Sequence, residues 1–228
     1  MCSRYFLDAD GNIIAYTFRV PQNPRVQRRY NIAPTQEAPV VRVDAGGARE
    51  LAILRWGLVP SWAKDIGVGN KMINARGESV AEKPAFREAL RKRRCLVPAT
   101  GFFEWEGPPG RKQPFAITVP EAPVFAFAGL WESWRPAGGE PVQTFTIVTT
   151  DANDAVAAIH DRMPVILAPG DADTWLAGDL ERARALLKPF AGEVKLRPVT
   201  RRMSDPRAEG PECLDDPEPT WGAQQRLL

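Results

Sequence analysis

The sequence predicts one α+β domain with a largely antiparallel, barrel-like β core and several short flanking helices. Three observations favour this class. The chain has 228 residues, 44% hydrophobic and 25% charged, values typical of a globular protein with a sizeable core. Its 22 prolines are spread throughout, which favours short strands and turns over long helices. Strand patterns outnumber helix patterns and do not alternate regularly with them, as they would in a parallel α/β sheet.

Several of the predicted strands are rich in β-branched and aromatic residues and are bounded by glycine or proline. They are Ala38–Val43, Leu51–Trp56, Cys95–Pro98, Phe115–Val119, Val124–Trp131 and Gln143–Thr149, with Val194–Arg197 as a weaker candidate.

Four helices are expected, over Pro84–Lys92, Ala152–His160, Asp171–Leu176 and Leu180–Leu187. Pro84 fits the first turn of a helix, and Asp151 could cap the second helix. The stretch after Thr200 is polar and proline-rich. We therefore expect residues 201–228 to be a loosely ordered tail of a single domain that spans residues 1–228.

Several classes of protein are excluded at this stage. The sequence has no run of 18 apolar residues and no long apolar segment near Met1, so we predict a cytoplasmic protein without membrane contact. The scattered Cys2, Cys95 and Cys213 do not form a disulfide framework. A zinc site from these cysteines and His160 is not expected, because no short Cys-x-x-Cys spacing exists. His160 is the single histidine, which excludes mechanisms that need two.

The net charge of +2 conceals an asymmetry along the chain. Residues 1–100 contain 17 basic and 9 acidic side chains, whereas residues 101–228 contain 13 and 19. A basic half favours a polyanionic partner, nucleic acid first among them. The densest basic run, Arg91 to Arg94, could equally be a solvated helix end.

Cys2 is a candidate nucleophile if Met1 is removed, because the chain would then begin with a 1,2-aminothiol. An α-amine has a pKa near 7.7–8.0, against roughly 10.4 for lysine, so far more of it is unprotonated at neutral pH. Such an amine condenses with aldehydes to a Schiff base. Only an N-terminal cysteine can then add its own thiol to the same carbon and close a thiazolidine ring.

Glu104 and His160 are candidates for proton transfer. Glu104 is flanked by Phe102, Phe103 and Trp105, and desolvation there would raise its pKa towards neutrality. It could instead point outward on an alternating strand. His160 follows a predicted helix within a polar cluster, which suits a general acid or base, although a histidine at a helix end is often only a partner of the helix dipole.

Asn74 and Arg76 follow a turn that carries Trp56 and Trp62. An exposed Trp62 could stack on a base, Arg76 offers a fork suited to phosphate, and Asn74 offers both a donor and an acceptor. Each could also be an ordinary core or turn residue.

Six short motifs occur in an order that points to one family. They are Met1-Cys2, Tyr30-Asn31-Ile32-Ala33-Pro34, Trp56-Gly57-Leu58-Val59-Pro60-Ser61-Trp62, Asn74-Ala75-Arg76-Gly77-Glu78, Arg94-Cys95-Leu96-Val97-Pro98-Ala99 with Gly101-Phe102-Phe103-Glu104-Trp105, and Ile159-His160-Asp161-Arg162-Met163-Pro164. With these motifs the sequence resembles the SOS-response-associated peptidase (SRAP) family of abasic-site-processing proteins. One departure is Ser3, where the family usually has glycine.

The resemblance implies the SRAP fold and a sensor that shields abasic sites in single-stranded DNA through a covalent thiazolidine crosslink to Cys2. It implies that Asn74 orients the amine and the opened sugar, and that Glu104 shuttles protons. His160 would assist ring opening and crosslink reversal, and Arg76 would bind phosphate. Further DNA-contacting or site-supporting positions would be Arg4, Asn31, Trp62, Thr149 and Arg162.

The resemblance also implies a role in DNA repair and the SOS response, association with the nucleoid, and a monomer that meets replication-fork proteins. Lyase and autoproteolytic peptidase activities belong to the same expectation, and no cofactor or metal does. Two alternatives stay open: a thiol peptidase that pairs Cys95 or Cys2 with His160, and a module that binds single-stranded DNA without covalent chemistry.

Overall fold

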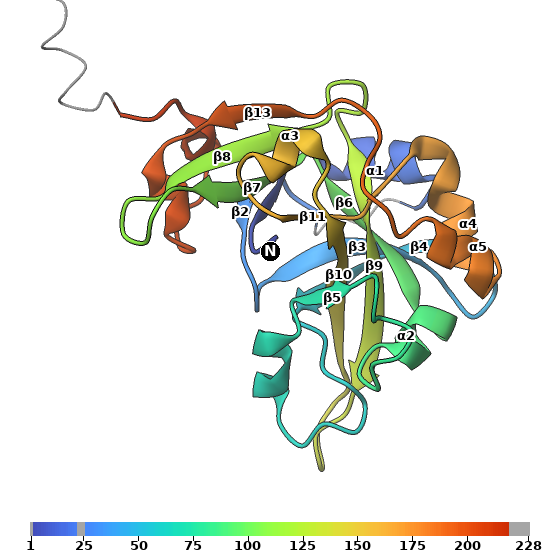
Figure 1. The fold of residues 1–228 in the computed structure, drawn as a ribbon. Helices are drawn as coiled ribbons and strands as arrows, with labels where there is room; N and C mark the ends of the chain where they lie inside the picture. Colours follow the sequence, from blue (N-terminus) through green and yellow to red (C-terminus); the bar gives the residue numbers. More distant parts are fainter. Residues whose placement is uncertain (1, 22–25, 219–228) are drawn as a thin grey trace, which may run out of the picture.

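The computed structural model describes residues 2–21 and 26–218, and the strands within these ranges form two sheets (Figure 1). The smaller sheet has the order β13 (Lys195–Pro198), β8 (Gln113–Thr118), β7 (Gly101–Glu106), β1 (Tyr5–Leu7) and β2 (Arg29–Ile32). The larger sheet has the order β11 (Arg162–Pro164), β10 (Val142–Asp151), β4 (Arg49–Trp56), β3 (Glu37–Val43), β6 (Arg94–Ala99), β9 (Phe125–Trp134) and β12 (Ile166–Leu167). A short further strand, β5 (Asn74–Arg76), pairs with β10.

The larger sheet closes on itself as a barrel. Strands β3, β4, β10, β9 and β6 form a ring, because β10 pairs with both β4 and β9. The β4–β10 pairing is parallel, with Thr144 opposite Arg55, and the other pairings in the ring are antiparallel. The predicted α+β class with a largely antiparallel, barrel-like core is therefore confirmed.

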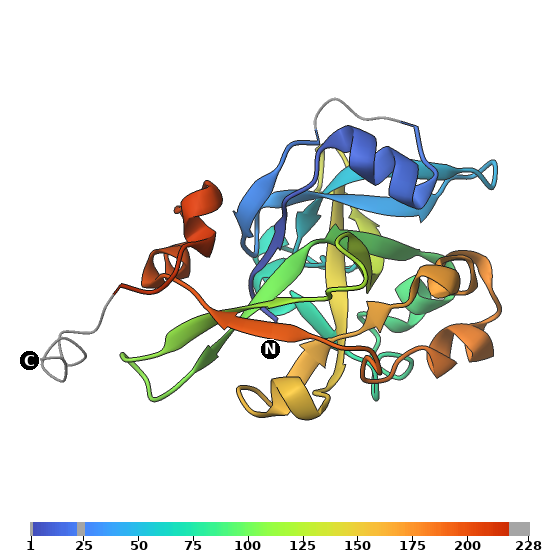
Figure 2. The same ribbon diagram turned by 90° about the horizontal axis from the view of Figure 1, so that it is seen from above.

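Short helices flank the sheets (Figure 2). They are α1 (Gly11–Phe18), α2 (Arg87–Lys92), α3 (Asp154–Ala157), α4 (Ala172–Ala177) and α5 (Leu180–Ala185), with 3-10 helices η1 (Ile66–Lys71), η2 (Pro169–Asp171), η3 (Arg201–Ser204) and η4 (Pro211–Leu214). Among the described residues, no helix combines the length and the apolar character needed to cross a membrane.

An aromatic cluster joins the two sheets. Tyr5 of β1 packs edge-on against Trp56 of β4, with ring centroids 5.3 Å apart, and against Phe127 of β9. Phe102 of β7 also meets Phe127, at 5.9 Å. Offset and edge-on aromatic pairs add stability beyond the area they bury. The cluster therefore fixes β1, which begins three residues after Cys2, at the junction of the sheets.

All seven predicted strands are present, and none of their ends differs by more than three residues from the prediction. Three of the four predicted helices are shorter than predicted, and the fourth, α4, has the predicted length but begins one residue later, at Ala172. Pro84 lies in a turn before α2, which begins at Arg87. Asp151 does not cap α3, because it ends β10 and pairs with Arg162. The cap is Asn153, whose side chain accepts the Val156 N–H at 3.1 Å.

The basic run at the end of α2 is divided between exposed side chains and side chains that bind within the protein. Arg91 and Lys92 are exposed. Arg94 is buried and donates to the carbonyls of Leu90 at 2.8 Å and Gly178 at 2.6 Å, which joins the end of α2 to the end of α4. Arg93 also binds within the protein, through Glu132 at 2.6 Å, so half of the run is structural and does not belong to a solvated helix end.

The loose tail predicted after Thr200 differs from the structure over residues 201–218. This segment forms η3 and η4, and it buries Met203 and Cys213 completely. These side chains pack with Phe6, Phe103 and Ala116 on the outer face of the smaller sheet. Polar composition hid this packing because two apolar residues anchor the whole segment. Residues 219–228 lie outside the described part of the chain.

Candidate active site

Three of the four predicted catalytic residues, Cys2, Asn74 and Glu104, interact although they come from distant parts of the sequence, and His160 lies next to a residue whose charge acts on Glu104. The Asn74 side chain donates from Nδ2 to the carbonyl oxygen of Cys2 at 2.7 Å. Glu104 lies close enough to Cys2 for its charge to act on the Cys2 thiol. Asp161, next to His160, acts in the same way on Glu104. The cluster therefore joins β1, β5, β7 and the turn before β11.

Cys2 is completely buried, and its Sγ lies 3.7 Å from the carbonyl oxygen of Arg4, to which it donates. Burial raises the pKa of the Cys2 thiol far above its usual range, and the negative charge of Glu104 adds to the rise. The resting thiol is therefore protonated. A free α-amine at Cys2 requires removal of Met1, which lies outside the described residues.

Glu104 points inward from β7. Its exposed fraction is 2%, whereas Glu106 on the same strand is exposed. Burial raises the pKa of Glu104 to about 7. The structure thus decides between the two interpretations of this residue: it is a desolvated carboxyl that is about half ionised at neutral pH, and not an outward-facing surface residue.

His160 lies in the turn between α3 and β11, with its side chain 28% exposed. Its Nδ1 accepts the backbone N–H of Arg162 at 2.9 Å and lies 3.0 Å from Oδ1 of Asp161. Burial lowers the pKa of His160 although Asp161 opposes the shift. The ring is therefore mainly neutral at pH 7, and the bond to Nδ1 assigns its proton to Nε2.

β5 presents Asn74 and Arg76 on one face and buries Ala75 on the other, as strand alternation requires. Asn74 Oδ1 is buried and has no hydrogen-bond partner among residues 2–21 and 26–218. Arg76 is exposed. The edge of β5 therefore offers an amide acceptor next to Cys2 and a guanidinium directed to solvent.

The remaining predicted positions divide into two groups, of which the first is Trp62 and Thr149. Trp62 is 63% exposed in the turn after β4, as the stacking hypothesis requires. Trp134 holds this turn, because its Nε1 donates to the carbonyl of Ala63 at 2.7 Å. Thr149 is completely buried on β10, and its Oγ1 has no partner in the described part of the chain.

Arg4, Asn31 and Arg162 are engaged by the protein itself. Arg162 donates to both carboxylate oxygens of Glu78, to Asp151 at 2.6 Å and to the carbonyl of Thr149 at 3.0 Å. Arg4 and Asn31 donate to carbonyls of the C-terminal segment. These contacts support the site, and contact of the three side chains with DNA stays a prediction.

The sequence reasoning missed Lys112, an exposed residue in the turn between β7 and β8. Its positive charge opposes the rise that burial gives the pKa of Glu104, and it adds to the fall that burial gives the pKa of His160. A lysine in a polar hairpin gives no sequence signal, because its position becomes relevant only when β7 and β11 are brought together.

Cys95, the other candidate for a thiol nucleophile, is an interior residue of β6. Burial raises the pKa of its thiol far above the usual range, and the thiolate is the nucleophilic form. A resting Cys95 thiolate paired with His160 therefore finds no support. Among the residues that the structure describes, no group of three or more His, Cys, Asp or Glu side chains is placed to bind a metal ion.

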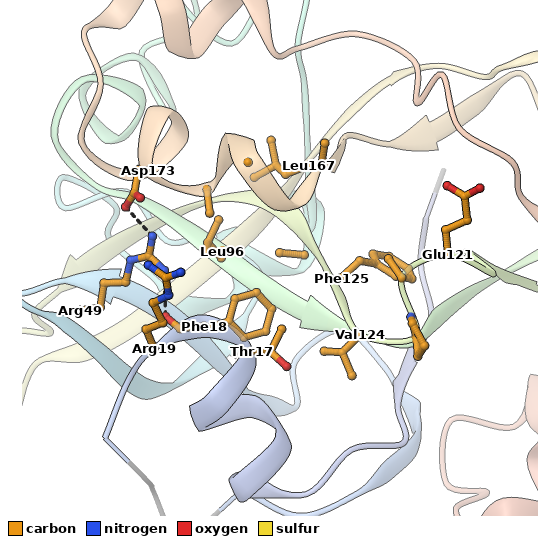
Figure 3. Close-up of a pocket in the computed structure, with 16 residues that line it drawn as sticks. Thr17, Phe18, Arg19, Arg49, Leu96, Glu121, Val124, Phe125, Leu167 and Asp173 are labelled. Atoms are coloured by element: carbon orange, nitrogen blue, oxygen red, sulfur yellow. Dashed lines mark hydrogen bonds and ion pairs between the residues drawn. The ribbon is translucent and has the colours of Figure 1, made fainter.

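A separate cavity of about 560 Å³ lies between α1, the start of β9 and α4 (Figure 3). Its walls include Phe18, Leu96 and Phe125, and Arg49 crosses one side in an ion pair with Asp173. None of the predicted site residues lines it.

Known proteins resemble this chain in sequence and in fold. The model of the SOS response associated peptidase (SRAP) family matches residues 1–206. The chain is 38% identical over 223 residues to the abasic site processing protein YoqW of Bacillus subtilis, covering 94% of this chain and 99% of YoqW. It is 34% identical over 224 residues to the abasic site processing protein HMCES of Gallus gallus, covering 83% of this chain and 66% of HMCES. A crystal structure of a protein from Bacteroides thetaiotaomicron superposes with a TM-score of 0.85 at 28% identity, over 94% of this chain and 99% of the other.

Proposed function

The chain belongs to the SOS response associated peptidase family, and from this membership and the geometry of the site we propose that it processes abasic sites in single-stranded DNA. The product is a thiazolidine crosslink between Cys2 and the abasic deoxyribose. One observation carries the proposal: the Cys2 carbonyl is held by Asn74 at 2.7 Å beside a buried carboxyl, Glu104, with a pKa of about 7. This arrangement suits an N-terminal amine that must exchange protons while it attacks a carbonyl.

The first step opens the sugar, because an abasic deoxyribose is mostly a closed hemiacetal. The Glu104 carboxylate accepts the proton of the hemiacetal hydroxyl as the bond between the ring oxygen and C1′ breaks. His160 Nε2–H donates a hydrogen bond to the departing oxygen, which takes its proton from solvent. Glu104 can accept the proton because its carboxyl is about half ionised at neutral pH. His160 can donate because its neutral imidazole carries its proton on Nε2.

The second step forms the imine. The Cys2 amine attacks the C1′ aldehyde and forms a C–N bond, giving a carbinolamine. The carbinolamine hydroxyl leaves as water after protonation by Glu104, and an iminium remains. Asn74 Oδ1, which has no partner within the described residues, is placed next to Cys2 to accept an N–H of this amine.

The third step closes the ring. The Cys2 thiol is protonated at rest because it is buried, so it does not react before the electrophile exists. The iminium places a positive charge on the nitrogen that is bonded to Cα, which lowers the pKa of the thiol. Sγ then adds to C1′ and its proton passes to Glu104. The overall reaction joins an aldehyde and an aminothiol with loss of one water.

DNA binding is assigned to the exposed side chains. Arg76 offers a guanidinium to a phosphate, and Trp62 offers a ring face on which a base can stack. A continuous strand needs an open surface, and the exposed side chains of Arg76 and Trp62 meet this need, whereas neither lines the cavity of Figure 3.

Intact-mass measurement tests the proposal directly. The protein is measured alone, which reports whether Met1 is removed, and after incubation with a single-stranded oligonucleotide that carries one abasic site. We expect one adduct equal to protein plus oligonucleotide minus one water, stable to heat. Cys2→Ala should lose this adduct and Cys95→Ala should keep it. The reverse pattern, loss with Cys95→Ala and retention with Cys2→Ala, would overturn the proposal.

A lyase activity follows from the same intermediate. Cys2→Ala keeps an α-amine and can still form the imine, but it has no thiol to close the ring. The imine allows a base to remove the C2′ proton, so that the C3′–O bond breaks and the 3′ phosphate leaves. We expect Cys2→Ala to cleave the strand slowly and to be trapped on DNA by borohydride. An uncleaved oligonucleotide and no trapped adduct would contradict the imine step.

A further inference from the structure

The C-terminal segment, residues 200–218, is attached to the same strands that hold the proposed site. η3 contacts β8 and η4 contacts β2, and Figure 2 shows both 3-10 helices beside the smaller sheet. Met203 and Cys213 are completely buried against Phe6 and Phe103. Phe6 is on β1, which continues from Cys2, and Phe103 precedes Glu104 on β7. The segment therefore packs behind the residues that the proposed reaction uses.

Two side chains bind the main chain of this segment. Arg4 donates to the carbonyls of Met203 at 3.1 Å and Ser204 at 3.4 Å. Asn31 Nδ2 lies 3.0, 2.8 and 3.0 Å from the carbonyl oxygens of Met203, Asp205 and Ala208, which share its two N–H donors. Arg4 also donates to Asn31 Oδ1 at 3.1 Å, so the two side chains form one network. Asn31 is completely buried, which makes each of these bonds costly to lose.

The main chain of Arg4 faces the other way, towards the site. Its carbonyl oxygen accepts the backbone N–H of Phe103 at 3.0 Å and lies 3.7 Å from the Cys2 thiol, which donates to it. Gly101, at the start of β7, leaves room for the ring of Phe6 on β1, because a Cβ there would lie 2.2 Å from that ring. Arg4 thus connects the C-terminal segment, the nucleophile and the strand that carries Glu104.

We propose that Arg4 and Asn31 are positioning residues, which use residues 203–208 of the C-terminal segment to fix Cys2 relative to Glu104. This inference rests on the proposed function. It gives Arg4 and Asn31 a positioning role in place of the DNA contacts that were expected of them. A guanidinium that is held by two carbonyls and an amide oxygen serves to fix β1 against β7. Without this attachment, the first residues of the chain lose the anchor that keeps the amine and the carboxyl within reach of one carbon.

The test uses the full chain with Arg4→Lys, Arg4→Gln and Asn31→Ala. Arg4→Lys keeps the positive charge but cannot span both carbonyls and Asn31 Oδ1. Arg29→Ala is the matched control: it removes another contact between the smaller sheet and the C-terminal segment, the 2.7 Å ion pair with Glu209, which does not touch Cys2. Binding is measured with an oligonucleotide carrying tetrahydrofuran, an abasic analogue without an aldehyde. Crosslinking is measured as the single-turnover rate at saturating abasic DNA.

We expect Arg4→Lys and Asn31→Ala to slow crosslinking at least tenfold and to leave the affinity for the tetrahydrofuran oligonucleotide and its salt dependence within twofold of the wild type. Arg29→Ala should change neither quantity. The Arg4→Gln/Asn31→Ala double variant should be about as slow as the slower single variant, because both belong to one network. A normal rate in Arg4→Lys, with weaker binding and a shallower salt slope in Arg4→Gln, would assign Arg4 to a phosphate and overturn the proposal.

A second readout does not depend on DNA. Alkylation of Cys2 by iodoacetamide is followed by peptide mass spectrometry, with Cys95, buried in the barrel, as the internal reference. Arg4→Lys and Asn31→Ala should increase Cys2 alkylation relative to Cys95 at least fivefold, and Arg29→Ala should not. Unchanged alkylation in folded variants would overturn the proposal even where the wild type crosslinks. Increased alkylation with no wild-type adduct would keep the positioning role and reject the proposed reaction.

Discussion

Glu104→Gln should make the protein more stable and less active, and the size of both effects follows from burial. Glutamine keeps the shape of the side chain and removes its charge. Burial raises the pKa of Glu104 from its ordinary 4.5 to about 7. At 1.36 kcal/mol for each pKa unit, this rise corresponds to about 3 kcal/mol, an order-of-magnitude figure for the cost of ionising the carboxyl inside the protein.

The sign of the pH dependence follows from proton linkage. Between pH 4.5 and about 7 the folded protein keeps the Glu104 proton and the unfolded chain releases it, so this residue makes stability fall as pH rises. Above about pH 7 both states are ionised and the full cost is present. Glu104→Gln should therefore unfold with a free energy about 3 kcal/mol above the wild type at pH 8, and the difference should vanish towards pH 4.5.

Urea unfolding at pH 4.5, 6 and 8 measures this difference, with Glu106→Gln as the control. Glu106 is exposed two residues further along the same strand, so its substitution should change the unfolding free energy by less than about 0.5 kcal/mol. An equal or lower stability of Glu104→Gln at pH 8 would refute the argument that this carboxyl is held in an unfavourable, desolvated state.

The same variant should crosslink about 10²- to 10⁴-fold more slowly than the wild type, the usual contribution of one acid–base group. Its affinity for the tetrahydrofuran oligonucleotide should be nearly unchanged, because Glu104 contacts no phosphate in the proposed complex. Both proteins share the Cys2 amine, so its ionisation cancels in the ratio of the wild-type to the variant crosslinking rate. The pH dependence of this ratio therefore reports the ionisation of Glu104, and the ratio should rise up to about pH 7 and then level off. A ratio independent of pH, or equal losses of rate and affinity, would remove Glu104 from proton transfer.

Three further substitutions separate binding from folding. Arg76→Ala should weaken DNA binding and reduce the slope of log affinity against log salt by about 1, because an exposed phosphate contact is lost. Fluorescence anisotropy measures this slope, and an unchanged slope would exclude the contact. Trp62→Ala should cost about 1–3 kcal/mol of DNA-binding free energy, which is the contribution of one stacked base. The melting temperature should not change, since the Trp62 side chain is 63% exposed. A lower melting temperature with normal binding would make Trp62 a structural residue. Arg162→Met should lower the unfolding free energy by about 2 kcal/mol in urea titration, because the buried guanidinium joins Glu78, Asp151 and the Thr149 carbonyl. Unchanged stability with weaker DNA binding would instead assign Arg162 to contact with DNA.

The strands of the barrel could be predicted because their evidence is local. Segments such as Gln143–Thr149 alternate or concentrate β-branched and aromatic residues, and the same residues are buried in β10. The ring closure through the parallel β4–β10 pair could not be predicted, because no residue pattern specifies which distant edges meet. The short β1 and β5 were also missed, since three residues carry too little periodicity to predict a strand.

The exposure and burial of individual site residues could be predicted better than the contacts that hold them in place. Trp62 and Glu104 have the exposure and the burial that their neighbours suggested. The contacts of Arg4 and Asn31 with residues 203–208 span more than 170 positions and end on main-chain carbonyls, which side-chain composition does not reveal. Arginine and asparagine are typical of DNA surfaces and of internal anchors alike, so only the fold distinguishes the two uses.

The central place of β10 sets the order in which the molecule can fold. β10 pairs with β4, β5, β9 and β11, and it ends at Asp151. While the chain emerges from the ribosome, β4 and β9 each keep an open edge until this strand is available, and open edges invite pairing with other chains. β5, which carries Asn74, pairs with no other strand among those described. The nascent chain therefore acquires its amide contact to the second residue only late in synthesis, after two thirds of its length has been made.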